Sequence, residues 1–315
     1  MTKMADKIAT RESYGKALAE FGAIYKNLVV LDADLAAATK TGTFKKAFPE
    51  RFFDCGIAEN NMIGAAVGLS LCGKIPFAST FAMFAAGRSF EQIRNAIGYP
   101  HNNVKIGATH AGITVGEDGA THQCNEDIAL MRTIPGMVIL NPADDTEARL
   151  AVKAAIEHDG PVYLRFGRMA VPTYFGADYD FKIGKGVKMA DGNDVALIAT
   201  GIEVEQALAA RELLAAEGIS ASVINIATIK PLDEELVVAE ATRCGAVVTC
   251  EEHNIIGGLG GAVCECLAEK KPTPVLRVGV QDVFGRSGPA KELVSYFGLD
   301  AASIAAKAKA AISLK

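Results

Sequence analysis

Short apolar runs alternate with longer alanine-rich stretches along most of the chain. Residues 28–31, 137–140 and 195–199 are runs of this kind, rich in valine, isoleucine and leucine and followed by polar or turn-forming residues. Parallel strands need a long connection between them, usually a helix, so this alternation predicts parallel sheets with helices packed on both faces. We therefore expect an α/β fold built from two consecutive three-layer units.

The domain organisation follows from length and from one change of pattern. A chain of 315 residues exceeds what a single hydrophobic core usually organises. Residues 169–192 are turn-rich and loosely patterned, and a new α/β pattern follows them. We predict a first domain over residues 1–170, a linker over residues 171–192 and a second domain over residues 193–315.

Composition excludes several classes of protein. The formal net charge of −5 argues against a nucleic-acid partner, because phosphate contacts need a basic surface. No apolar run reaches the roughly 20 residues that span a bilayer, and the first residues lack the apolar core of a signal peptide. The seven cysteines show no metal-ligand spacing and are interpreted as free thiols in a reducing compartment. These features predict a cytoplasmic protein that binds neither membranes nor nucleic acids.

One acidic and two aromatic residues stand out at predicted strand ends. Glu59 follows a predicted strand and a glycine, where it would occupy the first turn of a helix. An acid at this position is often only a favourable partner for the helix dipole. Phe81 and Phe84 follow another predicted strand, where α/β sheets bind ligands. The two rings are either core residues or a platform for a flat heterocycle.

Residues 109–126, which we call the histidine loop, form a long segment between predicted elements. The loop contains His110, His122, Glu117 and Asp118 together with three glycines. Loops longer than about 12–15 residues are usually functional or disordered, and the apolar residues in this one argue against disorder. The separation of the two histidines matches no zinc motif. The loop therefore favours recognition of a hydroxylated substrate, with histidine available for proton transfer near neutral pH.

The order of these motifs resembles the C-terminal half of transketolase, a pyrimidine-binding domain followed by a C-terminal domain. The resemblance covers essentially the whole chain and includes Gly-Ile-Ala-Glu-Asn at 56–60, Thr-Phe-x-x-Phe at 80–84, the histidine loop and Cys-Glu-Glu-His-Asn at 250–254. It implies an enzyme that uses thiamine diphosphate to transfer a two-carbon ketol unit from a ketose, or ketose phosphate, to an aldose or aldose phosphate.

The resemblance also implies which residues bind the cofactor. Glu59 matches the catalytic glutamate that hydrogen-bonds a ring nitrogen of the aminopyrimidine and so activates the cofactor. Phe81 and Phe84 match the aromatic wall against that ring. Asp34 matches an acid close to the cofactor, and the alternative is a turn residue at a strand end.

A further set of residues matches the substrate channel of the family. His110 and His122 are implied to be catalytic and substrate-binding, beside the reacting carbonyl and hydroxyl groups. Asp118 matches an acid that selects hydroxyl stereochemistry. Arg11 and Arg168 match arginines that hold a sugar phosphate, a task suited to the guanidinium fork.

Some positions depart from the family pattern or have competitors. Gly87 stands where many transketolases have a third aromatic residue, and Arg165 competes with Arg168 for the phosphate role. The phosphate-site serine is missing, and Thr39 or Thr41 would have to replace it. A substrate with a different anionic group, or with none, is therefore compatible with the sequence.

The sequence lacks the Gly-Asp-Gly motif that, with a later asparagine, holds Mg²⁺ and the diphosphate in thiamine-diphosphate enzymes. The resemblance therefore implies that a separate N-terminal transketolase subunit shares the thiamine diphosphate and binds the Mg²⁺, with no metal on this chain. A site between two chains implies an α2β2 assembly containing a homodimer of this chain.

Three alternatives stay open. The β subunit of a 2-oxo acid dehydrogenase shares the two-domain plan, but its loop does not normally read Gly-Glu-Asp-Gly-x-Thr-His-Gln. A deoxyxylulose-phosphate synthase-like enzyme has a closer loop but is normally one longer chain. A non-catalytic scaffold subunit has no physical need for the intact set Glu59, Phe81, His110, Asp118 and His122.

Overall fold

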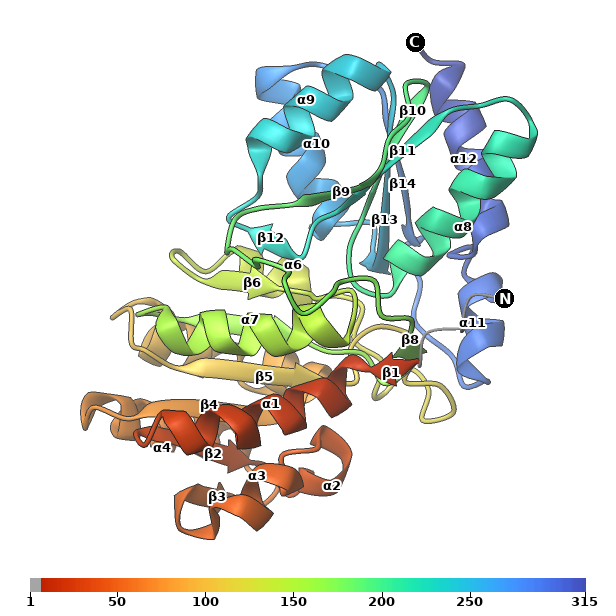
Figure 1. Ribbon diagram of the computed structural model, residues 1–315. Helices are drawn as coiled ribbons and strands as arrows, with labels where there is room; N and C mark the ends of the chain where they lie inside the picture. Colours follow the sequence, from red (N-terminus) through yellow and green to blue (C-terminus); the bar gives the residue numbers. More distant parts are fainter. Residues whose placement is uncertain (1–6) are drawn as a thin grey trace.

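The computed structural model describes residues 7–315. Residues 1–6, which include the start of the first predicted domain and the segment assessed for a signal peptide, lie outside the described part. Two sheets lie one above the other in Figure 1, each with helices on both faces. The predicted α/β class with two layered units is confirmed.

The first unit is built on a seven-stranded sheet with the order β12-β6-β7-β5-β4-β2-β3. Its strands are β2 (Leu28–Asp32), β3 (Phe52–Asp54), β4 (Ile75–Phe81), β5 (Lys105–Thr109), β6 (Val138–Leu140), β7 (Val162–Arg165) and β12 (Thr228–Lys230). All neighbouring pairs are parallel except β12 with β6. β12 comes from the second half of the chain, so a late segment completes the edge of the first sheet.

Helices cover both faces of this sheet and enclose two hydrophobic clusters. On one face lie α1 (Thr10–Ile24), α3 (Gly42–Ala47) and α7 (Asp145–Glu157). On the other face lie α4 (Glu59–Leu71), η2 (Phe84–Arg88), α5 (Phe90–Gln92), η3 (Ile93–Gly98) and α6 (Asp127–Arg132). The short α2 (Ala36–Thr39) and η1 (Pro49–Arg51) complete the unit.

The segment that follows β4 is not one continuous α-helix. η2 and η3 are π-helical, and the short α5 lies between them. Gly87 and Ser89 lie in this segment and are weaker helix formers than alanine or leucine. A π-helical turn inserts an extra residue and often occurs at functional sites.

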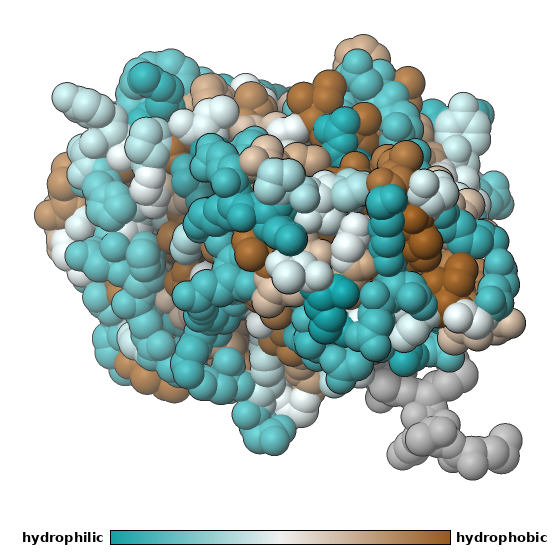
Figure 2. Space-filling model, turned by 90° about the horizontal axis from the view of Figure 1, so that it is seen from above, coloured by the Kyte–Doolittle hydropathy of each residue, from teal (hydrophilic) through white to brown (hydrophobic). Residues whose placement is uncertain are grey.

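The second unit is built on a five-stranded sheet with the order β14-β13-β10-β11-β9. Its strands are β9 (Val187–Ala190), β10 (Val195–Ala199), β11 (Ala221–Asn225), β13 (Val247–Asn254) and β14 (Val275–Val280), of which only β9 runs antiparallel to its neighbour. Its helices are α8 (Glu203–Ala216), α9 (Glu234–Cys244), α10 (Leu259–Lys270), α11 (Ala290–Tyr296) and α12 (Ala301–Ile312). The face of this unit seen in Figure 2 is mainly hydrophilic, with apolar residues interspersed.

The segment predicted as a linker, residues 171–192, contains structure. β8 (Ala170–Val171) pairs with β1 (Ile8–Ala9), and β9 joins the second sheet. The exact domain limits stay a prediction. None of the helices in residues 7–315 combines the length and apolar character needed to cross a membrane.

A buried carboxyl group joins the two units. Glu147, on α7, has no solvent exposure and accepts hydrogen bonds from Asn225 on β11, from the Tyr179 hydroxyl and from the Ala143 backbone N–H. Burial outweighs these bonds and raises the pKa of Glu147 from 4.5 to about 7. Three separate segments therefore converge on one acidic side chain.

Replacing Glu147 with alanine should lower the free energy of unfolding by about 2–3 kcal/mol, because three donors lose a buried acceptor. Chemical unfolding in urea measures the change. Glu157→Ala is the control on the same helix, since this exposed residue bonds Lys153 and Tyr25 at the surface and should change stability by about 0–1 kcal/mol. Equal losses in the two variants would contradict the interdomain role.

The same residue should give stability a pH dependence. A folded-state pKa raised from 4.5 to about 7 means that the stability contributed by the proton is present below 4.5 and is lost as pH rises through about 7. The unfolding free energy should therefore fall over this window, and less steeply in Glu147→Ala than in the unaltered chain.

Candidate active site

The predicted site residues converge on one edge of the seven-stranded sheet. β5, β4, β2 and β3 are consecutive parallel neighbours, so their carboxyl ends lie at the same edge. His110 follows β5, Phe81 ends β4, Asp34 follows β2, and Glu59 starts the helix that follows β3. Residues far apart in the sequence are thus brought together by strand order.

Glu59 is the first residue of α4 and is only 4% exposed. Its Oε1 accepts a hydrogen bond from Nη1 of Arg88 at 2.8 Å. The Arg88 guanidinium also lies over the Phe84 ring, 3.9 Å from the ring centroid. Sequence reasoning missed Arg88, although its position four residues after Phe84 would bring the two side chains together on one face of a helix.

The predicted aromatic wall and the two histidines form one cluster. The rings of Phe81 and Phe84 stack with centroids 5.6 Å apart. His110 stacks on Phe81 at 3.9 Å, and His122 meets Phe84 edge-on at 5.4 Å. The cluster presents stacked faces and an imidazole edge next to Glu59 and Arg88, a suitable surface for a flat heterocycle.

His110 is held in one protonation state and one tautomer. Its ring is 3% exposed, and Nη1 of Arg11 lies 2.8 Å from its Nε2. Arginine can only donate, so Nε2 is the acceptor and the proton sits on Nδ1, which donates to Oγ1 of Thr109 at 2.9 Å. Burial, with the nearby positive charges of Arg11 and Arg168, lowers the pKa of His110 from 6.5 to about 3. His110 is therefore a neutral hydrogen-bonding group at physiological pH.

Asp118 and Arg168 lie together at the outer part of the histidine loop. Nη1 of Arg168 is 4.0 Å from Oδ2 of Asp118 and 3.6 Å from Oε2 of Glu117. The same nitrogen donates to the Val115 carbonyl, and the Arg168 side chain is 37% exposed. The guanidinium and the two carboxylates are thus accessible at the mouth of the cluster.

Arg165, the competitor of Arg168, has a different environment. Its side chain is 3% exposed and Nε donates to Asp127 at 2.9 Å, in an ion pair that Tyr163 also hydrogen-bonds. Its charge is neutralised inside the protein. Of the two arginines, Arg168 is the one that a substrate can reach.

The segment after β2 corrects one expectation. Thr39 and Thr41 are fully buried, and their hydroxyls donate to Oδ2 of Asp32 at 2.7 and 2.8 Å. Neither hydroxyl is available to replace a phosphate-site serine, so that expectation is wrong. Burial raises the pKa of Asp32 to about 6. Asp34 is exposed, and its backbone N–H donates to Oδ1 of Asp54 rather than contacting the aromatic cluster.

A cavity of 400 Å³ adjoins the aromatic cluster. The first unit contributes Phe84, Gly87 and Arg88 to its wall, and the second unit contributes Phe284. Gly87 lies in the cavity wall, where an added side chain would overlap the end of the Met83 side chain. The cavity is large enough for a single heterocyclic ring with its substituents, and both units of the chain line it.

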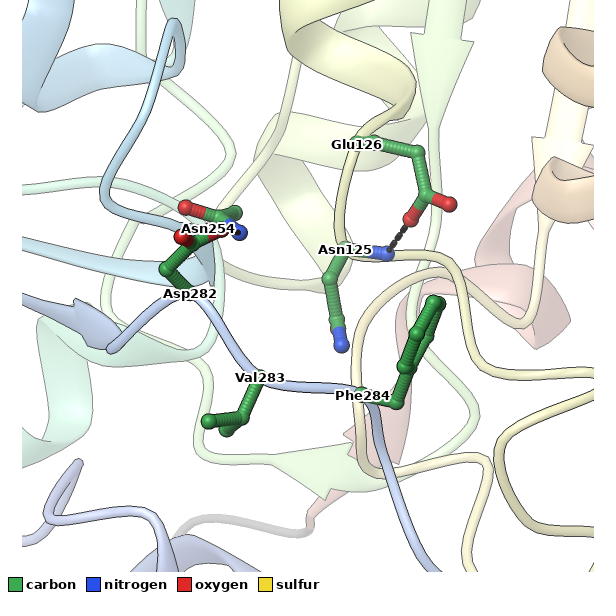
Figure 3. A pocket seen from close by; sticks show the side chains of 6 residues that line it. All are labelled: Asn125, Glu126, Asn254, Asp282, Val283 and Phe284. Carbon is green, nitrogen blue, oxygen red and sulfur yellow. Dashed lines mark hydrogen bonds between the residues drawn. The ribbon is translucent and has the colours of Figure 1, made fainter.

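A smaller cavity of 190 Å³ lies beside it. Figure 3 shows Asn254 and Asp282 on one side of it and Asn125 and Glu126 on another, with Phe284 beside Asn125. Within residues 7–315, no cluster of three or more histidine, cysteine, aspartate or glutamate side chains has the geometry to hold a metal ion.

NMR can test the state assigned to His110. Its ring should stay neutral and protonated on Nδ1 between about pH 5 and pH 8, whereas an unperturbed histidine titrates in that range. Since the unfolded chain binds this proton near pH 6.5 and the folded chain only near 3, His110 should reduce stability as pH falls through that window. Arg11→Met removes a positive charge beside the ring and should raise the pKa of His110. A titration near pH 6.5 in the unaltered chain would show that the assignment is incorrect.

Comparisons with known proteins give consistent matches. A family model described as the transketolase pyrimidine binding domain matches residues 6–173, and one described as the transketolase C-terminal domain matches residues 184–304.

A provisionally assigned transketolase C-terminal section from Methanocaldococcus jannaschii is 53% identical over 94% of this chain and 93% of its own length. The 6-deoxy-6-sulfo-D-fructose transketolase subunit SqwH of Clostridium sp. is 44% identical over 93% of this chain and 91% of its own length. A solved split-gene transketolase, described as an inactive beta4 tetramer, superposes with a TM-score of 0.91 at 53% identity, covering 98% of this chain and 100% of that one.

Proposed function

The chain belongs to the transketolase family, and we propose that it is the C-terminal subunit of a two-chain transketolase that transfers a two-carbon ketol unit from a ketose to an aldose. The observation that carries this proposal is the buried Glu59 carboxylate beside the stacked Phe81 and Phe84 rings, next to a cavity at the strand ends. We also propose a first domain over residues 1–170, a linker over residues 171–192 and a second domain over residues 193–315. The family matches at residues 6–173 and 184–304 support a division in this region.

The site fits one half of thiamine diphosphate. A carboxylate shielded from water and an aromatic wall suit the aminopyrimidine ring, which needs a hydrogen bond at its edge and stacking on its face. Arg88 now bonds Glu59 and covers Phe84, so the ring has to displace Arg88 or share Glu59 with it. When bound, the cofactor supplies the nucleophile and the electron sink for breaking the carbon–carbon bond of the sugar.

The other half of the cofactor requires a partner. Hard oxygen ligands suit Mg²⁺, and the described residues offer no acidic cluster for it. We propose that an N-terminal transketolase subunit binds the Mg²⁺ and the diphosphate, in an α2β2 assembly around a homodimer of this chain. The solved relative that is described as an inactive beta4 tetramer supports the view that this half is inactive without its partner. The seven free cysteines support a reducing, cytoplasmic location.

The residues of the histidine loop receive roles that their geometry supports. Neutral His110 offers Nε2 as an acceptor for a substrate hydroxyl group once Arg11 shifts to the substrate anion. His122, in contact with the aromatic cluster, serves as the second catalytic imidazole. Asp118 selects hydroxyl stereochemistry, and Arg168 helps Arg11 to hold the anionic end of the sugar.

The anionic end of the substrate is proposed not to be restricted to phosphate. The hydroxyls of Thr39 and Thr41 are bound to Asp32, so neither is free to donate to the anion. One relative is named for a sulfonated sugar, 6-deoxy-6-sulfo-D-fructose. Arginine binds sulfonate and phosphate alike, so the assay below should include both classes of ketose.

The test is reconstitution with a Gly-Asp-Gly…Asn subunit encoded by a neighbouring reading frame. Ketol transfer to an aldose, measured by mass spectrometry of the sugar products, should appear only when both chains, thiamine diphosphate and Mg²⁺ are present. The purified single chain should show negligible activity, and robust turnover without a partner would overturn the split-subunit proposal.

Glu59→Gln should slow activation of the cofactor on the order of 10²–10⁴-fold in the reconstituted pair, because the amide cannot share a proton with the ring. Exchange of the cofactor's C2 proton with deuterium measures activation directly, and circular dichroism checks that the fold is retained. Asp118→Asn is the control, expected to change the preference among ketoses while leaving proton exchange near normal. Normal turnover in Glu59→Gln would remove this residue from the mechanism.

A further inference from the structure

The root of the histidine loop lies between the two sheets. Residues 111–116 are all buried, and Ile113 belongs to the hydrophobic core of the second unit. Gly112 forms a β-bridge with Cys124, which closes the base of the loop. The outer part of the loop, residues 117–122, therefore projects from a root that is embedded in the second unit.

Glu252, near the end of β13, makes a hydrogen bond with this root. Its side chain is 3% exposed, and Oε1 accepts the backbone N–H of Thr114 at 2.6 Å. A side chain at Gly112 would overlap the Glu252 carboxyl group, and the φ of Gly112 is +74°. The Glu252 carboxyl group therefore packs directly against the backbone of the loop root. Only glycine at position 112 allows this close approach.

Further contacts tie the strand that carries Glu252 to the other end of the loop. Arg165 donates to the Glu252 carbonyl at 2.9 Å and to Asp127, the first residue after the loop, at 2.9 Å. The Asn254 backbone N–H donates to the Asn125 carbonyl at 2.7 Å. β13 of the second unit thus holds both ends of a loop that belongs to the first.

We propose that Glu252 is a positioning residue of the active site, which fixes the root of the histidine loop and thereby sets where His110, Asp118 and His122 stand. Among the described residues, Glu252 makes no hydrogen bond to any of these three side chains. It acts through the loop backbone at Gly112 and Thr114. The claim that Glu252 places catalytic side chains rests on the proposed function. The claim that it fixes the root of the histidine loop does not.

The adjacent residue supplies a matched control. Glu251 is equally buried, and its carboxyl oxygens accept the backbone N–H groups of Leu259 and Gly260 at 2.6 and 2.8 Å, at the start of α10. It therefore stabilises the second unit at a helix N-terminus without bonding the histidine loop.

Amide hydrogen exchange on the purified full chain tests the structural claim without any partner. In Glu252→Leu, exchange of the peptide covering residues 109–126 should rise about tenfold, because one buried hydrogen bond is lost. Glu252→Gln keeps an Oε1 acceptor and should stay near the unaltered chain. Glu251→Leu should expose the start of α10 and leave residues 109–126 protected. Unchanged protection of the loop in Glu252→Leu would overturn the proposal.

Gly112→Ala provides a second route if Glu252→Leu does not fold. The added methyl group meets the Glu252 carboxyl group, so the loop root should loosen although the acid is intact. Loop exchange that stays as slow as in the unaltered chain would contradict the proposal in this variant too.

Kinetics of the reconstituted pair tests the catalytic claim. Glu252→Leu should lower kcat/KM for the ketose about 10–100-fold, since a misplaced loop spoils the alignment of the substrate. Glu252→Gln should restore most of the loss. A loss no larger than that of Glu251→Leu at the same folded fraction would reject the positioning role. If the unaltered pair shows no ketol transfer, the proposed function fails and the exchange experiment still decides the inference.

Discussion

Parallel pairing of the strands in the first sheet is the constraint on which the site depends. Parallel neighbours end at one edge, and each needs a crossover helix that leaves from that edge. Glu59 opens one such helix, while Phe81 and His110 lie at the ends of adjacent strands β4 and β5. Hydrogen bonds of the sheet backbone, made without regard to side chains, therefore assemble a carboxylate, an aromatic wall and an imidazole from distant parts of the sequence.

Buried ionisable side chains at the junction of the two units give this assembly its precision. Arg165, Asp127, Glu147 and Glu252 all have little or no exposure. Removing such groups from water is unfavourable, and the loss is offset only when each finds well-placed partners. Glu147 bonds Asn225, Arg165 bonds the Glu252 carbonyl, and Glu252 bonds the loop root. These contacts cross between the units, so the two sheets can satisfy them in few relative positions. We interpret this as the source of a fixed site between units whose sheets are otherwise separate.

The sequence was a good guide where local pattern and strand order decide the outcome. The apolar runs 28–31, 137–140 and 195–199 form strands with limits close to those of the runs, and Glu59 begins a helix as expected. Contacts set by tertiary packing were harder to foresee. The π-helical turns after β4 depend on how the helix meets the sheet, and they bring Arg88 onto Glu59.

Burial was the second quantity that the sequence did not reveal. Thr39 and Thr41 have side chains suited to an anion site, but the neighbouring Asp32 is buried and takes both hydroxyls. Arg165 and Arg168 cannot be separated by residue type, whereas the structure gives one a buried ion pair and the other an accessible position. The role of Glu252 could not be predicted, because no local sequence pattern shows that β13 contacts both ends of the loop.

The short strand β12 has a consequence for how the chain can be divided. It adds residues 228–230 from the second half to the edge of the first sheet, where Thr228 pairs with Leu140 and Lys230 binds the carbonyls of Arg132 and Ile134. If the chain were cut between the two units, β6 would lose this neighbour. Its unpaired backbone groups would then be exposed at the edge of the sheet, which promotes aggregation. The second half of the chain thus supplies a strand to the sheet of the first unit. A gene fragment that ends at the apparent boundary between the units would encode an incomplete sheet.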